Sequence, residues 1–169
     1  MSPTTPKKHQ APATPLRILK IDTCPTFSGE STLTYHIGCT PKSDIHIRVY
    51  ANTGGGFFSP EWVALKDIQK ALEKAEPITS IVLYPLLKGR SVNTTAFLLA
   101  VLKHEQLIQP LKGKQRRHEL MDPKGFLARV NKLIASKVDL KPEDTPRKAP
   151  RKTSKKAAIK KRAAISKQK

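Results

Sequence analysis

The stretch LTYHIGCTPKSDIHIRVY, residues 33–50, decides the expected fold more than any other part of the chain. Apolar and polar residues alternate at both of its ends, which is the two-residue period of a half-buried β-strand. The Thr-Pro-Lys-Ser-Asp sequence between the two runs is typical of a turn. A loop at residues 40–44 keeps both apolar faces on one side and places Cys39 opposite Ile45. The stretch therefore predicts an antiparallel hairpin.

Four side chains in and near this hairpin have the atom types of a zinc site: Cys24, His36, Cys39 and His46. The pleat directs Cys39 toward the core and both histidines to the outer surface, where His36 faces Arg48. Three of the four groups then cannot converge on one ion. We therefore expect a buried cysteine, two surface histidines, and no metal or other cofactor.

The rest of the chain alternates between short strand patterns and helical ones, which predicts an α+β fold. Ser59 and Pro60 form a helix start signal, and the neighbouring Phe57, Phe58 and Trp62 have the character of core anchors. The run at 78–87 is compatible with a strand or with a helical turn. We expect a small antiparallel sheet packed with about three helices, built from a strand at 16–21 and helices at 60–74, 92–106 and 123–137.

Basic residues dominate the chain, and most of their excess lies at one end. Lys and Arg number 32 and Asp and Glu 13, which gives a formal net charge of +19. Residues 141–169 contain twelve basic, two acidic and no aromatic residues, so they supply more than half of that charge. Such a segment cannot bury enough apolar surface to fold alone. We predict a disordered segment at 1–15, a globular domain at 16–139 and a disordered Lys/Arg/Ala/Pro-rich tail at 140–169 that binds nucleic acid.

Two four-residue units add direction to this charge pattern. TPKK at residues 5–8 and TPRK at residues 145–148 resemble the Ser/Thr-Pro-basic-basic units of histone H1 tails. The resemblance implies turn-like segments that lie along DNA. Proline presets the backbone of such a turn, and the paired cations can meet phosphates.

The segment SVNTTAFLLAVLKHEQLI, residues 91–108, with KGKQRRHEL at 112–120, resembles the second half of a winged helix-turn-helix domain. Such domains end a recognition helix in a Leu-x-x-Leu-x-x-Glu-Gly-Leu-Ile pattern and continue into a basic hairpin, the wing. The resemblance implies that residues 91–121 form such a helix and wing. Gln106 stands where the family has glycine, and Pro85 interrupts the preceding helix. The matching positions are Leu99, Leu102, Glu105, Leu107 and Ile108, with Gly113 at the wing turn.

The sequence contains no complete catalytic motif. The pairs His118-Glu119 and His104-Glu105 both lack the second histidine of a zinc-hydrolase helix. The glycines at 54–56 are not followed by the Gly-Lys-Ser/Thr of a nucleotide loop. The longest apolar run, residues 96–102, is far shorter than a membrane span. We therefore expect a non-enzymatic intracellular protein with no membrane contact and no small-molecule substrate.

These observations predict a protein that binds nucleic acid, with double-stranded DNA favoured, as a transcriptional regulator or a nucleoid- or chromatin-associated protein. It would act in the cytoplasm on the nucleoid, or in the nucleus of a eukaryote. Phosphate contacts would supply most of the affinity, and base reading would come from Arg90, Asn93 and Thr94. RNA binding, and a protein-interaction module that forms a homodimer through helix 92–106, remain alternatives.

The predicted nucleic-acid-binding residues fall into a core set and a tail set. The core set is Lys88, Arg90, Asn93, Thr94, Thr95, Lys103, Lys112, Lys114, Arg116 and Arg117. The tail set is Arg147, Lys148, Arg151, Lys152, Lys155, Lys156, Lys160, Lys161 and Arg162.

Overall fold

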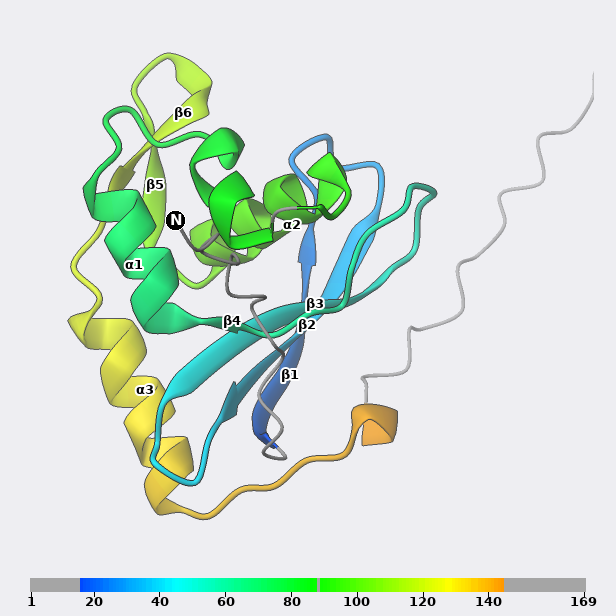
Figure 1. Cartoon of the computed structure of the whole chain (residues 1–169), viewed down its shortest axis with the longest axis vertical. Coiled ribbons are helices and arrows are strands. Elements are labelled where there is room, and N and C mark those ends of the chain that lie inside the picture. The colour runs from blue at the N-terminus through cyan, green and yellow to red at the C-terminus, as the bar shows by residue number, and fades with distance from the viewer. Residues whose placement is uncertain (1–15, 88, 145–169) are drawn as a thin grey trace, which may run out of the picture.

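The protein is described here by a computed structural model that covers residues 16–87 and 89–144. The predictions for residues 1–15, for Lys88 and for the tail from residue 145 onward lie outside the described residues. Within them, strands and helices pack into one body, with a two-stranded hairpin at one end (Figure 1).

A four-stranded antiparallel sheet forms the centre of the fold. Its strands follow the chain in order, so each one pairs with the next. The predicted hairpin is confirmed together with its register, since Cys39 lies opposite Ile45 and His36 opposite Arg48. The α+β class is confirmed as well. The strands are β1 (Arg17–Pro25), β2 (Thr32–Cys39), β3 (Ile45–Asn52) and β4 (Val63–Ala64).

The inner face of this sheet carries the apolar side chains that the alternation predicted. Leu33, Tyr35 and Ile37 of β2 are buried, as are Ile47 and Val49 of β3. They pack against α1 (Leu65–Glu73) and α2 (Val92–His104) in one continuous core. Burial of each large aliphatic side chain stabilises the fold by about 1.5–3 kcal/mol, so this face holds the helices on the sheet.

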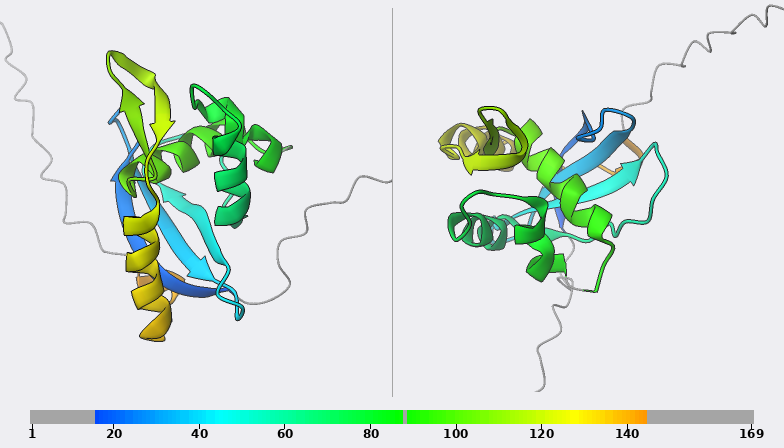
Figure 2. Two further views of the ribbon diagram at one scale, coloured as in Figure 1. Left: turned by 90° about the vertical axis from the view of Figure 1, so that its left-hand side faces the viewer. Right: turned by 90° about the horizontal axis from the view of Figure 1, so that it is seen from above.

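Helix α2 is buried within its own chain. Five consecutive residues, from Leu98 to Leu102, are buried. The helix crosses the sheet and packs on β1, β3 and the 3-10 helix η1 (Ser80–Leu87) (Figure 2). The apolar residues that favoured a dimer interface at 92–106 are therefore largely covered without a second copy.

The start of the first helix was predicted wrongly. Ser59 and Pro60 lie in an irregular segment, and the chain then forms β4, where Val63 pairs with Ile47. Helix α1 begins only at Leu65, after the strand pairing ends. Tertiary pairing with β3 thus overrides a local start signal.

The three aromatic residues next to that segment do not form a common core anchor. Phe57 is 91 % exposed, which contradicts the prediction. Phe58 is half-buried and meets Phe97 of α2 edge to face. Trp62 lies over the outer face of the sheet, close to Gly38. Only Phe58 therefore packs against the core between sheet and helices.

The run at 78–87 is neither a full strand nor a helix of α type. Ile78 pairs with His118 through two backbone hydrogen bonds, both of 2.9 Å. The chain then turns into η1, which contains Pro85. This pairing joins the segment to the hairpin at residues 108–120.

The outer face of the sheet holds a histidine that the sequence placed at the surface. His36 is completely buried, and His46 is nearly so, which corrects that expectation. Arg48 donates to His36 Nδ1 from Nε at 3.2 Å. The Arg48 guanidinium also lies over the rings of Tyr50, at 5.0 Å, and Trp62, at 4.4 Å. The sheet is thus covered on this side by its own aromatic and cationic side chains.

The last third of the described chain forms a hairpin, a helix and a returning segment. Strands β5 (Ile108–Leu111) and β6 (Lys114–Leu120) are joined by a turn in which Gly113 has a φ of +71°. Helix α3 (Lys124–Ala135) follows, and Asp122 Oδ1 accepts from the Lys124 N–H at 3.0 Å, as the predicted helix start required.

The segment after α3 returns to the sheet (Figure 1). Leu140 donates its N–H to the Ile18 carbonyl at 2.8 Å and forms a bridge with β1. A short 3-10 helix, η2 (Pro142–Asp144), follows. Residues 140–144 therefore pack with the sheet, whereas the sequence assigned them to the tail.

Substitution of Gly38 by alanine should destabilise the protein by about 1–3 kcal/mol. A Cβ atom at this position would lie 2.9 Å from both the Arg17 carbonyl oxygen and the Trp62 indole. The matched control is Gly125→Ala in α3, where the nearest atom would be 3.8 Å away. That variant should gain up to about 1 kcal/mol, because alanine favours helix. Urea unfolding measures both, and equal stabilities would contradict the close packing at Gly38.

The stability of the protein should fall as the pH drops from about 6.5 to about 4. Burial, with the Arg48 charge nearby, lowers the pKa of His36 to about 4 from its ordinary value of 6.5. In this window the unfolded chain binds a proton that the folded protein does not, at a cost of about 3 kcal/mol over the full range. The His36→Gln variant keeps an acceptor for Arg48 and should lose less stability over the same range. Unfolding curves at several pH values test this, and identical pH dependence in both proteins would refute it.

Candidate nucleic-acid interface

Four of the predicted cations lie together on the β5–β6 hairpin. Lys112 is at its turn, and Lys114, Arg116 and Arg117 are on β6. All four are exposed, and none forms an ion pair with another residue in the described part of the chain. Unpaired cations at this density repel one another unless an anion approaches. The structure therefore places four of the predicted cations on one exposed hairpin.

A cleft of about 910 Å³ opens beside the hairpin. Its walls come from the hairpin, from α2, from the start of η1 and from the β1–β2 connection. Among the residues that the structure describes, Lys103 and Arg116 are the two cations of the lining, and no carboxylate belongs to it. The Lys103 ammonium lies 5.5 Å from the centre of the Phe27 ring. The lining residues are Phe27, Ser28, Thr79, Ser80, Ile81, Ala96, Leu99, Lys103, Pro110, Arg116 and His118.

His118 is the unusual residue of this cleft. Only 1 % of it is exposed, and neither imidazole nitrogen makes a hydrogen bond within the described residues. Burial, with the Lys103 charge nearby, lowers the pKa of His118, although the Ile78 carbonyl opposes the shift. The neutral ring therefore has one donor and one acceptor unused. A buried polar group left in this way costs about 1–3 kcal/mol.

Charge singled out Lys103 and Arg116 from the sequence, whereas His118, which lines the same cleft, was not among the candidate residues. The sequence showed it only as part of an incomplete zinc-hydrolase motif. The alternation of β6 could have indicated His118, because residues two apart on a strand share a face. This period places His118 on the side of Arg116. Phe27 and Thr79 had no such signal, since they come from separate connections.

The structure does not bring the predicted base-reading residues to the hairpin. Arg90 forms an ion pair with Glu61. Asn93 Nδ2 donates to the Phe57 carbonyl at 3.4 Å, on the glycine-rich loop. Both lie at the start of α2, whereas Lys103 lies near its end, and a helix of this length spans about 20 Å.

Thr94 and Thr95 are buried instead of displayed. The Ser59 N–H donates to Thr94 Oγ1 at 3.0 Å, and Thr95 Oγ1 donates to the Val92 carbonyl at 2.7 Å. Their hydroxyls stabilise the start of α2 and are not available at the surface. Lys88 and the nine predicted tail cations lie outside the described residues.

A buried carboxylate positions the end of α2 and thus Lys103. Glu105 Oε1 lies 2.6 Å from the Lys20 ammonium and accepts from the Tyr35 hydroxyl. Glu105 Oε2 lies 3.5 Å from the Arg129 guanidinium. Burial tends to lower the pKa of Lys20, but its hydrogen bonds to Glu105 and Asp22 outweigh this and raise it. Lys20 therefore stays protonated at neutral pH.

The turn after α2 explains how Gln106 replaces the glycine of the winged-helix pattern. Gln106 has a φ of +61°, a left-handed conformation that favours glycine. Its N–H donates to the Lys103 carbonyl at 3.1 Å, and the Leu107 N–H donates to the Leu102 carbonyl at 2.9 Å. Glutamine thus adopts the cap that glycine normally forms. A helix at 92–104 and a hairpin at 108–120 are present, but nothing in the described residues identifies a winged helix-turn-helix domain.

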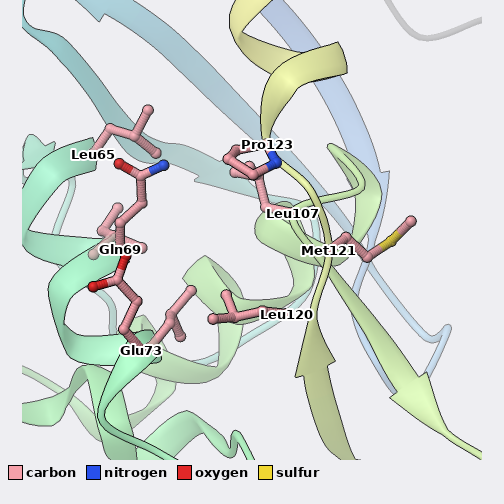
Figure 3. A pocket seen from close by; sticks show the side chains of 9 residues that line it. Leu65, Gln69, Glu73, Leu107, Leu120, Met121 and Pro123 are labelled. Atoms are coloured by element: carbon pink, nitrogen blue, oxygen red, sulfur yellow. The ribbon is translucent and has the colours of Figure 1, made fainter.

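A second, much smaller pocket of about 80 Å³ lies between α1 and the β6–α3 connection (Figure 3). Leu65, Leu107 and Leu120 form its apolar walls, and Gln69 and Glu73 of α1 also line it. Its described lining includes one carboxylate, that of Glu73, and no cation. The pocket therefore does not contribute to an anion-binding surface.

Within 16–87 and 89–144, no three His, Cys, Asp or Glu side chains are grouped so that they could hold a metal ion. No helix in these ranges has the length and apolar character needed to cross a bilayer.

Comparison with known proteins yields no family model, no curated protein and no solved structure that matches the chain.

Replacement of Glu105 by glutamine should destabilise the protein by about 2–4 kcal/mol, because it removes the buried negative charge that faces Lys20 and Arg129 and leaves Asp22 as the remaining carboxylate beside Lys20. The matched control is Glu119→Gln, which removes an exposed carboxylate hydrogen-bonded to Gln109. The control should change stability by no more than about 0.5 kcal/mol. Denaturant unfolding of both variants measures the difference. A Glu105→Gln protein as stable as the control would show that the buried carboxylate does not hold α2 in place.

Proposed function

We propose that the protein is a non-enzymatic nucleic-acid-binding protein for which double-stranded DNA is the favoured partner. One observation carries the proposal: five exposed cations without ion pairs among the described residues lie on or beside the β5–β6 hairpin, and two of them, Lys103 and Arg116, line a cleft to which no described carboxylate contributes. A solvated surface normally mixes both signs of charge, so a one-sided cluster favours a polyanionic partner. The cluster, which we call the hairpin cations, consists of Lys103, Lys112, Lys114, Arg116 and Arg117.

The hairpin cations would meet phosphates, and the basic tail would add further contacts along the same polymer. Each neutralised phosphate releases counterions, so the affinity would depend steeply on salt. The tail sequence supports this role through its charge alone. Phosphate contacts position a protein without reading sequence, and this fits a nucleoid- or chromatin-associated role at least as well as a transcriptional regulator.

Base reading by the turn before α2 is not part of the proposal. Arg90 is paired with Glu61, and Thr94 is buried. The proposal likewise does not depend on the winged-helix resemblance, since the hairpin cations are described by their own positions. Location in the nucleoid or the nucleus follows from the proposed partner.

The salt dependence of DNA binding tests the proposal. The intact protein should bind a duplex with an affinity that falls steeply with salt. One variant replaces four of the five hairpin cations by glutamine: Lys112, Lys114, Arg116 and Arg117. If all four contact phosphates, this variant should reduce the slope of log K against log salt by about 3 to 4. Glutamine at six tail cations should reduce it by about 5. Fluorescence anisotropy at several salt concentrations measures each slope.

A matched control removes the same number of charges from other surfaces. Lys42, Lys66, Lys70 and Lys137 are exposed and do not line the cleft. Their replacement by glutamine should change the slope by less than half as much. Equal effects of the two sets would show that net charge, and not the hairpin, drives binding. No binding of the intact protein to duplex DNA even at low salt would overturn the proposal, and competition with duplex RNA would establish which polymer is preferred.

A further inference from the structure

We propose that the cleft beside the hairpin binds one unpaired nucleotide, with its phosphate against Lys103 and Arg116 and its base between Phe27 and His118. For a nucleotide within a polymer, the inference rests on the proposed function. For a free nucleotide it stands alone. Both sources present the same chemistry to the cleft.

The charge of the cleft favours a phosphate. Lys103 comes from α2 and Arg116 from β6, so two separate elements direct cations at one space. No carboxylate from the described part of the chain lines that space to neutralise them. Thr79 and Ser80 contribute hydroxyl groups, which can also donate to phosphate oxygens. An anion with several oxygens matches this set of donors.

The apolar part of the cleft favours an aromatic ring. Phe27 is 44 % exposed and Ile81 is 77 % exposed, although both are large apolar side chains. Ala96 and Leu99 of α2 line the same cleft. Exposed apolar side chains gathered at one cleft are typical of a binding site. Stacking of a base on an aromatic side chain contributes about 1–3 kcal/mol.

His118 requires a ligand with a polar edge as well as a flat face. Both imidazole nitrogens are buried without a partner in ranges 16–87 and 89–144, and the Phe27 ring lies 5.3 Å from the imidazole. Because Phe27 is partly exposed and lies in the connection after β1, an incoming base can displace it. The edge of a base carries donors and acceptors side by side. It can therefore pair with an imidazole nitrogen that acts as a donor in one tautomer of His118 and as an acceptor in the other. A phosphate could accept from the imidazole N–H but would leave the acceptor nitrogen without a donor, and a purely apolar ligand would leave both nitrogens unpaired.

The size of the cleft, about 910 Å³, suits a single nucleotide and not a duplex. In a duplex the base edges are paired and the base faces are stacked, so neither can reach a buried histidine. An unpaired nucleotide offers both. The 80 Å³ pocket beside α1 lacks the cations and the size for the same ligand.

The test uses the full-length protein and two DNA duplexes that differ by one unpaired adenosine. At equal salt, the duplex with the unpaired adenosine should bind about tenfold more tightly, as expected for one added stacking contact. Lys103→Gln with Arg116→Gln should remove that preference. Lys112→Gln with Arg117→Gln removes the same charge from residues outside the cleft and should retain it. His118→Phe fills the same space without ring nitrogens and should also lose the preference.

A second arm needs no variant and no polymer. Deoxyadenosine monophosphate is added to the protein while the imidazole signals of His118 are followed by NMR. Shifts of these signals that saturate, and that vanish in the Lys103/Arg116 double variant, support a cleft that takes a free nucleotide. If a variant fails to fold, this arm on the unaltered protein decides the matter.

The outcomes separate the two proposals. A preference for the unpaired adenosine that depends on the cleft cations supports the inference with nucleic acid as the source. Saturable shifts without that preference support it with a free nucleotide as the source. Absence of both overturns the inference, while steep salt-dependent duplex binding would leave the proposed function standing. Failure to bind any nucleic acid overturns the proposed function alone if the monophosphate still shifts His118.

Discussion

The carboxylate of Glu105 is the interaction on which the arrangement of the other elements depends. It lies at the end of α2, and it joins Lys20 of β1, Tyr35 of β2 and Arg129 of α3. A buried carboxylate loses its hydration and needs hydrogen bonds and ion pairs from the protein instead. The Glu105 carboxylate obtains all of them only when the four elements are in place. Apolar packing on the sheet would allow α2 to slide or rotate. The directional bonds to Glu105 select one position, and this position places Lys103 on the wall of the cleft.

The hairpin of β2 and β3 could be predicted in detail because its causes are local. A two-residue period and a five-residue turn determine the register, and the pairing of Cys39 with Ile45 follows from them. The covering of the outer face could not be predicted in this way. His36 is buried by Arg48 together with Tyr50 and Trp62, and Trp62 reaches it from a different segment. Helix α1 starts late for the same kind of reason, since β4 forms only when β3 is beside it.

The cleft shows the same division between local and distant causes. Composition directed attention to the basic hairpin, and the hairpin and its Gly113 turn are present. The cleft itself is lined by residues from position 27 to position 118, brought together by the fold. No sequence window contains them. The base-reading residues illustrate the converse error, because Thr94 is polar in the sequence but serves as an acceptor inside the protein.

The bridge between Leu140 and Ile18 has a consequence for self-association. Strand β1 stands at the margin of its sheet, and such a margin presents unsatisfied peptide groups that can recruit a strand from another molecule. Leu140 occupies the Ile18 carbonyl and so shields part of this margin. The segment between α3 and the basic tail therefore also hinders pairing of β1 with a strand of another molecule. Proteolytic cleavage on the N-terminal side of Leu140 would release Leu140 together with the tail and would expose the edge of β1.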